Sequence, residues 1–129
     1  MSISYISVEL RRIVLQRAGG ICEYCLMADI DSFLGCQIDH IVGEKHGGPT
    51  AVDNLALACV YCNQAKGSDI GSILWATGEF VRLFNPRLDS WSEHFTLIES
   101  RIEPLSSIGQ VTANLLNFNA PEQIGRAHV

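Results

Sequence analysis

Residues 36–63 read CQIDHIVGEKHGGPTAVDNLALACVYCN, and this stretch decides the fold. Residues 36–41 and residues 54–58 are short apolar-rich runs, which predict two strands. The segment between them, residues 43–53, contains glycines and a proline and predicts a loop. Residues 60–66 predict a helix that follows the second strand directly. The stretch therefore predicts a pair of strands, joined by a loop, with a helix attached to the end of the second strand.

Cysteine spacing predicts a metal centre. The chain has five cysteines, and four of them form two C-x-x-C pairs, Cys22 with Cys25 and Cys59 with Cys62. Each C-x-x-C turn directs both sulfurs at one point, so two turns complete the tetrahedral shell of a zinc ion, which leaves no open position and is therefore structural. The alternatives are two unrelated pairs of free thiols, or thioredoxin-like redox chemistry that needs only one pair. The fifth cysteine, Cys36, is interpreted as a small buried residue on the first strand.

Residues suited to a second metal and to proton transfer occur in the same stretch. Asp39 and His40 are neighbours on a strand, so their side chains point to opposite faces, but both reach one site if the strand ends there and a helix packs across it. A carboxylate suits Mg²⁺ or Mn²⁺, and a neutral imidazole suits a general base. Asn63 follows Cys62 directly and offers a neutral oxygen ligand, so Asp39 and Asn63 could share one ion. The alternative is a hydrogen-bonded Asp-His pair, with Asn54 ending a turn and Asn63 facing solvent.

The N-terminal segment predicts an amphipathic helix over residues 8–18. Ser7 can cap its start, and Gly19-Gly20 ends it. Its predicted apolar face consists of Leu10, Ile13, Val14 and Ala18.

The C-terminal half predicts short strands and one more helix. Two strand-like runs flank Thr77-Gly78 and predict a hairpin, and residues 87–105 predict a helical turn and a second strand pair. A final helix starts at Ser107, with Gln110 completing a capping box. Its predicted apolar stripe contains Ile108, Val111, Leu115 and Phe118. Trp75 and Trp91 are interpreted as core or hairpin packing, and His94 as structural.

Composition sets limits on location and on partners. A chain of 129 residues with 47% apolar and 18% charged residues predicts one globular domain. The sequence contains no long apolar run and no secretory signal pattern, so the expected location is the cytoplasm, with no membrane contact. The formal net charge of −5 requires any nucleic-acid-binding face to be local. Its candidate residues are Lys45, Lys66 and Arg17, for which a solvated surface is the alternative interpretation.

Taken together, CEYC at residues 22–25 and IDHIVGEKHGGPTAVDNLALACVYCNQAK at residues 38–66 resemble the HNH endonuclease family in its four-cysteine, zinc-bearing form. The resemblance extends from Arg12 to about Gly67. His40 matches the first histidine of the family motif, and Asp39 the metal-binding aspartate before it. Asn54 matches the middle asparagine. Asn63 stands where the last histidine is expected, which makes this the H-N-N variant, also found in the HNH domain of CRISPR effector nucleases.

The resemblance implies a fold and a mechanism. The fold is α+β, with a ββα-metal (His-Me finger) motif, a structural zinc on Cys22, Cys25, Cys59 and Cys62, an N-terminal helix and a small C-terminal hairpin and helix extension. The implied division is a nuclease core with zinc knuckles at residues 1–70 and an extension packed on the same domain at residues 71–129.

The implied activity is metal-dependent hydrolysis of DNA phosphodiester bonds with one catalytic ion. His40 would be the general base, Asp39 and Asn63 would hold the ion, and Asn54 would hold the loop and orient His40. An asparagine at position 63 favours Mg²⁺ or Mn²⁺ over Zn²⁺ as the catalytic ion. DNA is the implied partner, and a homodimer or a protein partner stays open.

Two other functions compete with this interpretation. One is a non-catalytic, zinc-stabilised module that binds nucleic acid or protein, which the acidic net charge favours. The other is a rubredoxin-like iron carrier, since that family also uses two C-x-x-C knuckles. An iron carrier has no need of Asp39, His40, Asn54 or Asn63.

Overall fold

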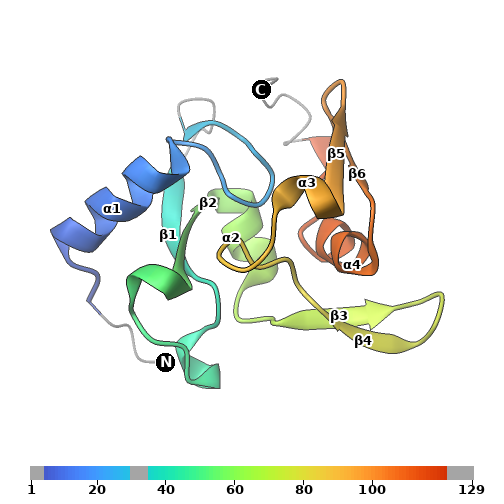
Figure 1. Cartoon of the computed structure of the whole chain (residues 1–129), viewed down its shortest axis with the longest axis horizontal. Coiled ribbons are helices and arrows are strands. Elements are labelled where there is room, and N and C mark those ends of the chain that lie inside the picture. Colours follow the sequence, from blue (N-terminus) through green and yellow to red (C-terminus); the bar gives the residue numbers. More distant parts are fainter. Residues whose placement is uncertain (1–4, 30–34, 122–129) are drawn as a thin grey trace.

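The computed structural model describes residues 5–29 and 35–121 of the chain. Its N-terminal half contains α1 (Val8–Ala18), β1 (Cys36–His40), the short 3-10 helices η2 (Glu44–His46) and η3 (Val52–Asn54), β2 (Leu55–Cys59) and α2 (Val60–Lys66). Its C-terminal half contains β3 (Gly71–Leu74), β4 (Glu79–Arg82), α3 (Trp91–His94), β5 (Phe95–Ile98), β6 (Arg101–Pro104) and α4 (Ser107–Leu115). Within the described residues the strands form three two-stranded antiparallel sheets (Figure 1).

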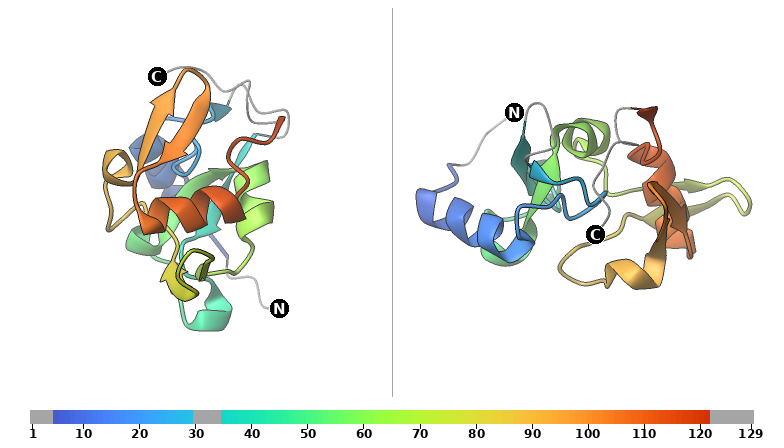
Figure 2. Two further views of the ribbon diagram at one scale, coloured as in Figure 1. Left: turned by 90° about the vertical axis from the view of Figure 1, so that its right-hand side faces the viewer. Right: turned by 90° about the horizontal axis from the view of Figure 1, so that it is seen from above.

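The β1–β2 pair and α2 confirm the order of elements predicted for residues 36–63. β1 and β2 are antiparallel, with Cys36 opposite Cys59 and His40 opposite Leu55. The predicted strand boundaries differ from the observed ones by one residue. β2 is buried along its whole length because α1 packs against it and α2 follows it and packs against both strands (Figures 1 and 2).

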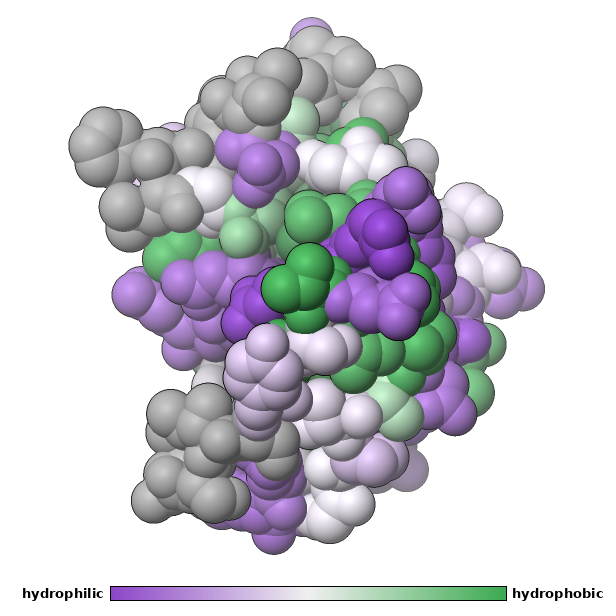
Figure 3. All heavy atoms as spheres, turned by 90° about the vertical axis from the view of Figure 1, so that its left-hand side faces the viewer, coloured by the Kyte–Doolittle hydropathy of each residue, from purple (hydrophilic) through white to green (hydrophobic). Residues whose placement is uncertain are grey.

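Helix α1 is capped as predicted, but its buried face is narrower than expected. The Ser7 hydroxyl accepts a hydrogen bond from the Leu10 amide, and Gly19 ends the helix in the left-handed conformation. Only Val14 of the predicted face is buried, and Ile13 is 37% exposed. A two-stranded sheet offers a narrow surface, so Leu10, Val14 and Ala18 contact it while Ile13 stays at the side. Figure 3 shows apolar side chains exposed among hydrophilic ones on this side of the molecule.

The C-terminal half has the predicted elements, with two corrections. The hairpin β3–β4, the helical turn α3, the pair β5–β6 and the final helix α4 are all present. The α4 cap is Ser106, whose hydroxyl accepts from the Gly109 amide, so the predicted capping box of Ser107 and Gln110 is wrong by one residue. Trp75 is 89% exposed rather than packed, because it lies in the β3–β4 turn, beyond the strand residues that reach the core.

One hydrophobic cluster joins the two halves of the chain. It extends from Cys22 in the first knuckle to Phe118 after α4. Phe84, Phe95 and Phe118 form its aromatic centre, with Phe84 and Phe95 in edge-to-face contact. Trp91 is packed as expected, since it contacts the Phe95 ring and donates a hydrogen bond to a backbone carbonyl. The proposed division at residue 70 stays a prediction.

None of the helices in the described part of the chain is both long and apolar enough to cross a membrane.

The loop between β1 and β2 has a glycine that cannot bear a side chain. A methyl group on Gly48 would lie 1.8 Å from the Val42 carbonyl oxygen and 2.9 Å from Asn54 Nδ2. We expect Gly48→Ala to lower the free energy of unfolding by about 3 kcal/mol, as measured by urea denaturation, because the backbone must move apart. The control is Gly43→Ala in the same loop, where the added methyl would lie 3.5 Å from Ser68 Cβ. That variant should stay within about 1 kcal/mol of wild type, and equal losses in the two variants would refute this explanation.

Candidate functional site

Four buried sulfurs meet at one point between the two halves of the chain. The Sγ atoms of Cys22, Cys25, Cys59 and Cys62 all lie within 4.8 Å of one another. The two knuckles have matching local geometry: the Cys25 amide donates to Cys22 Sγ, and the Cys62 amide donates to Cys59 Sγ, each over 3.4 Å. Cys59 is both the last residue of β2 and the N-cap of α2, so this cluster holds the strand pair and the helix together.

The electrostatics of the cluster favour a bound cation. Hydrogen bonding with Cys22 lowers the pKa of Cys59, whereas it raises the pKa values of Cys25 and Cys62 well above the usual thiol value. Four thiolates buried this close together would repel one another strongly without a cation, because water is excluded from the cluster. A tetrahedral Zn²⁺ takes four thiolates and removes this conflict, and the geometry fits a structural zinc. Burial raises the pKa of the remaining cysteine, Cys36, to about 12, and that residue is half-buried on β1.

Asp39 is buried at the interface of β1 with α2. Its Oδ2 accepts a hydrogen bond from the Tyr24 hydroxyl over 3.0 Å and lies 3.1 Å from Lys66 Nζ. Burial raises the pKa of Asp39, while Lys66 and Tyr24 act in the opposite direction. Tyr24 is also fully buried, and that burial raises its own pKa well above the usual value. Because Tyr24 lies between Cys22 and Cys25, the first zinc knuckle contacts Asp39 directly.

His40 lies at the end of β1 and contacts a different set of residues. Strand alternation places Asp39 on the α2 face and His40, like Ile38, on the opposite face, where Ile38 packs with the α1 cluster. The half-buried imidazole lies with Nε2 2.8 Å from the Thr50 hydroxyl, which belongs to the loop between the strands. The structure therefore pairs Asp39 with Lys66 and Tyr24, and His40 with Thr50.

Asn54 fastens both ends of the loop that carries Thr50. Its Oδ1 accepts from the Val42 amide over 3.0 Å, and its Nδ2 donates to the carbonyls of Val42 and Pro49, each over 2.9 Å. Asn54 is 8% exposed, so these bonds are largely protected from water. The Asn54 amide thus joins residues 42 and 49 of the loop.

Asn63 and Asp39 both face the interface between β1 and α2. Asn63 Nδ2 donates to Gln37 Oε1 over 2.5 Å, and Gln37 shares a strand face with Asp39. Asn63 and Lys66 are three residues apart and share a helix face. Because the side-chain nitrogen of Asn63 donates to Gln37, its side-chain oxygen is the atom that could bind a metal ion. A carboxylate together with an amide oxygen is a ligand set that suits Mg²⁺ or Mn²⁺. The Lys66 ammonium, however, contacts the Asp39 carboxylate that such an ion needs.

The three predicted nucleic-acid-binding residues lie in different environments. Lys45 is exposed on η2. Arg17 donates to the carbonyls of Val52 and Leu55 over 2.8 and 2.5 Å, which anchors its guanidinium at the base of the loop. Lys66 is 2% exposed, so its ammonium is inside the molecule rather than on its surface. Contact of any of the three with nucleic acid stays a prediction.

Several residues of the site carry no signal in the sequence. Tyr24 and Thr50 contact Asp39 and His40, and no motif marks them as partners. Arg87, in the C-terminal half, donates to the Leu55 carbonyl over 3.2 Å and forms an ion pair with Glu23. These contacts link residues that are far apart in sequence, and local patterns do not indicate such pairings.

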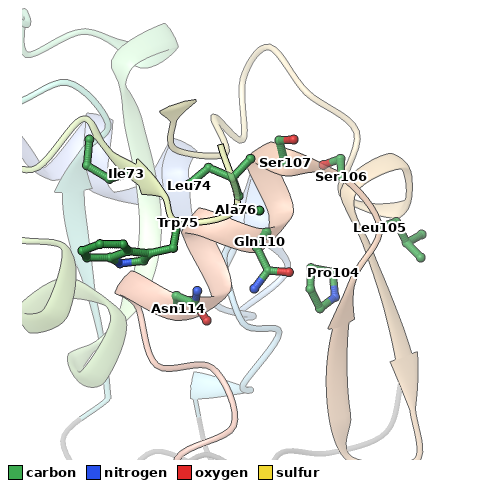
Figure 4. Close-up of a pocket in the computed structure, with 10 residues that line it drawn as sticks. All are labelled: Ile73, Leu74, Trp75, Ala76, Pro104, Leu105, Ser106, Ser107, Gln110 and Asn114. Carbon is green, nitrogen blue, oxygen red and sulfur yellow. The ribbon is translucent and has the colours of Figure 1, made fainter. Parts of the chain in front are cut away.

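A separate pocket of about 430 Å³ lies between the β3–β4 hairpin and α4 (Figure 4). Its lining carries no acidic, basic, histidine or cysteine side chain, only apolar residues with two serines, Gln110 and Asn114. Figure 4 shows Trp75 and Gln110 on opposite elements that border it. None of the predicted site residues lines this pocket, which is therefore separate from the zinc cluster and from the Asp39 and His40 sites.

Comparison with known families agrees with this geometry. Residues 22–69 match the model of the HNH endonuclease family. The matched region includes all four clustered cysteines, the β1–β2 pair and α2. None of the curated proteins compared with the chain matches it.

Removal of zinc should unfold the domain. We expect about one zinc per wild-type chain by elemental analysis, and loss of the cooperative thermal transition in a strong chelator, since binding energy of a structural zinc is folding energy. Cys22→Ser should contain far less zinc, because serine is a poor zinc ligand. Cys36→Ser is the matched control, because Cys36 is outside the cluster, and should bind zinc normally. Full zinc content in Cys22→Ser would exclude the four-sulfur centre.

Loss of the Asn54 amide should displace His40. Asn54→Asp removes the donor to Val42 and Pro49 and places a carboxylate beside their carbonyls, so we expect the free energy of unfolding to fall by about 3 kcal/mol. Asn119→Asp is the control, because Asn119 makes the same paired bonds, with the amide and the carbonyl of Ile102. Only Asn54→Asp should shift the His40 ring signals in NMR spectra. An unmoved His40 signal in that variant would show that Asn54 does not orient the imidazole.

Proposed function

We propose that this chain, whose residues 22–69 match the HNH endonuclease family, is a metal-dependent DNA endonuclease with His40 as its general base. The family match carries the proposal, because HNH domains act on nucleic acid and the matched region contains Asp39, His40, Asn54 and Asn63. The hydrogen bonds of Asn54 and Thr50 support it, because they hold a single imidazole in a defined place beside the loop.

His40 performs the proton transfer in the proposed reaction. One ring nitrogen takes a proton from water as the water oxygen forms a bond to phosphorus, and the bond from phosphorus to the 3′ oxygen breaks in line. Thr50 contacts Nε2 and keeps the ring from turning. Asn54 holds the loop that presents Thr50. The departing 3′ oxygen takes up a proton from solvent water, so the products are a 5′ phosphate and a 3′ hydroxyl.

Asp39 and Asn63 are the residues proposed to hold the catalytic Mg²⁺ or Mn²⁺, which when bound supplies positive charge near the phosphoryl oxygens. The role of this chain is to place a carboxylate and an amide oxygen at one interface, between β1 and α2. The zinc cluster supports that placement, since Cys59 starts α2 and Tyr24 of the first knuckle contacts Asp39.

A net charge of −5 predicts weak and salt-sensitive binding to DNA through local basic residues, for which Lys45 and Arg17 are the candidates. The cytoplasmic location, a homodimer and a protein partner also stay predictions. The second candidate function is a zinc-stabilised binding module without catalysis. The Lys66–Asp39 ion pair favours it, because that pair uses the carboxylate that catalysis would need.

Plasmid cleavage separates the two functions. We expect the zinc-loaded protein to convert supercoiled plasmid to open-circle or linear DNA with Mg²⁺ or Mn²⁺, and EDTA to stop it. His40→Ala should slow this conversion by about a hundredfold or more, since a general base contributes that much.

The matched control is His46→Ala, which removes an exposed histidine from the same loop and should leave cleavage unchanged. Equal activity of wild type and His40→Ala would mean that His40 is not the base. Absence of metal-dependent cleavage by folded wild-type protein at low salt would favour the binding module.

A further inference from the structure

Lys66 is a cation buried at the position where the divalent ion is proposed to bind. It is 2% exposed, which is rare for a lysine and requires partners. Its ammonium lies 3.1 and 3.5 Å from the two carboxylate oxygens of Asp39 and 3.0 Å from the carbonyl oxygen of His40. These three acceptors match the three donors of a lysine ammonium.

The pair is balanced in charge without a metal. The Asp39 carboxylate contributes one negative charge and the Lys66 ammonium one positive charge, and the other close partner, the Tyr24 hydroxyl, is neutral. A divalent ion on the same carboxylate would give this buried site a net positive charge. Like charges repel strongly where water is excluded, so ammonium and metal cannot share the carboxylate at close range.

We propose that Lys66 is the resident counter-ion of Asp39, which a divalent metal ion must displace in order to bind. Lys66 therefore sets the metal affinity of the site. The proposal rests on the proposed function only in taking Asp39 as a metal ligand. A lysine suits this role because its charge is on a flexible four-carbon chain that can swing away. Lys66 is also the last residue of α2, so the movement leaves the rest of the helix in place.

The metal binds only while the Asp39 carboxylate is free of Lys66. The apparent association constant for the metal is therefore the intrinsic constant multiplied by the fraction of time that the carboxylate is free. If Lys66 leaves Asp39 for one tenth of the time, removal of the ammonium should tighten metal binding about tenfold. A purely structural ion pair predicts something else: loss of Lys66 would lower stability and leave metal affinity unchanged.

The test measures Mn²⁺ binding by electron paramagnetic resonance, in which the signal of free Mn²⁺ falls as the ion binds. The zinc-loaded proteins are wild type, Lys66→Met, Lys45→Met, and the double variant Lys66→Met with Asp39→Asn. Methionine keeps an unbranched side chain and removes the charge. Lys45→Met removes the same charge from an exposed loop position and controls for net charge.

We expect Lys66→Met to bind Mn²⁺ about tenfold or more tightly than wild type, and Lys45→Met to bind as wild type does. The double variant should lose the gain, which assigns the ion to Asp39. Three results would each overturn the proposal: wild-type affinity in folded Lys66→Met, equal gains in the two lysine variants, or a full gain in the double variant.

A measurement on wild-type protein covers the case in which Lys66→Met does not fold. NMR of ¹⁵N-labelled lysine side chains should show a Lys66 ammonium protected from exchange with water. Saturating Mg²⁺ should abolish that protection and leave the Lys45 signal unchanged. Protection of Lys66 that persists at saturating Mg²⁺ would contradict displacement.

Plasmid cleavage by the same preparations separates this inference from the proposed function. Tighter Mn²⁺ binding in Lys66→Met without cleavage by any protein would support displacement and refute the nuclease. Metal-dependent cleavage by wild type, with unchanged Mn²⁺ affinity in Lys66→Met, would refute displacement and support the nuclease.

Discussion

The convergence of four cysteine sulfurs is the constraint on which the rest of the structure depends. Two short strands and a seven-residue helix bury too little surface to fix their own arrangement. A zinc ion on the cluster would replace that missing surface with metal–ligand bonds, because Cys59 ends β2 and caps α2 while the other knuckle follows α1. It also reaches the candidate site, since Tyr24 of that knuckle donates to Asp39. The cysteine cluster is thus linked to Asp39 through one buried tyrosine.

Asp39 and His40 are adjacent in sequence, but their side chains contact different parts of the structure. Asp39 is held from the zinc side and from α2, through Tyr24 and Lys66. His40 contacts Thr50 of the loop, and the hydrogen bonds of Asn54 hold that loop in place. A strand allows this arrangement because the side chains of successive residues point to opposite faces. The shared backbone still keeps the two residues next to each other.

Local sequence patterns predicted the order of the secondary-structure elements and the cysteine cluster. They did not predict contacts between residues that are distant in the sequence. The order of strand, loop, strand and helix follows from apolar runs and turn residues, and the cysteine cluster follows from spacing alone. The partners of Asp39 could not be predicted, because they come from a knuckle and from a helix end. Lys66 has a charged end that suits solvent, and only the fold shows it buried. The prediction for Trp75 was wrong in the opposite sense. A large aromatic ring favours a packed position, but the turn that carries Trp75 extends beyond the core and leaves the ring exposed.

The carbonyl oxygen of Leu55, across the strand pair from His40, accepts hydrogen bonds from two arginines. Arg17 comes from the N-terminal helix and Arg87 from the C-terminal half. Burial and then the charge of the neighbouring Arg87 lower the pKa of Arg17. Because the two arginines share one acceptor, we expect the effects of substitutions at these positions on stability to be coupled rather than additive. A change in α1 or in the C-terminal half therefore alters the contacts of one and the same carbonyl, at the strand end opposite His40.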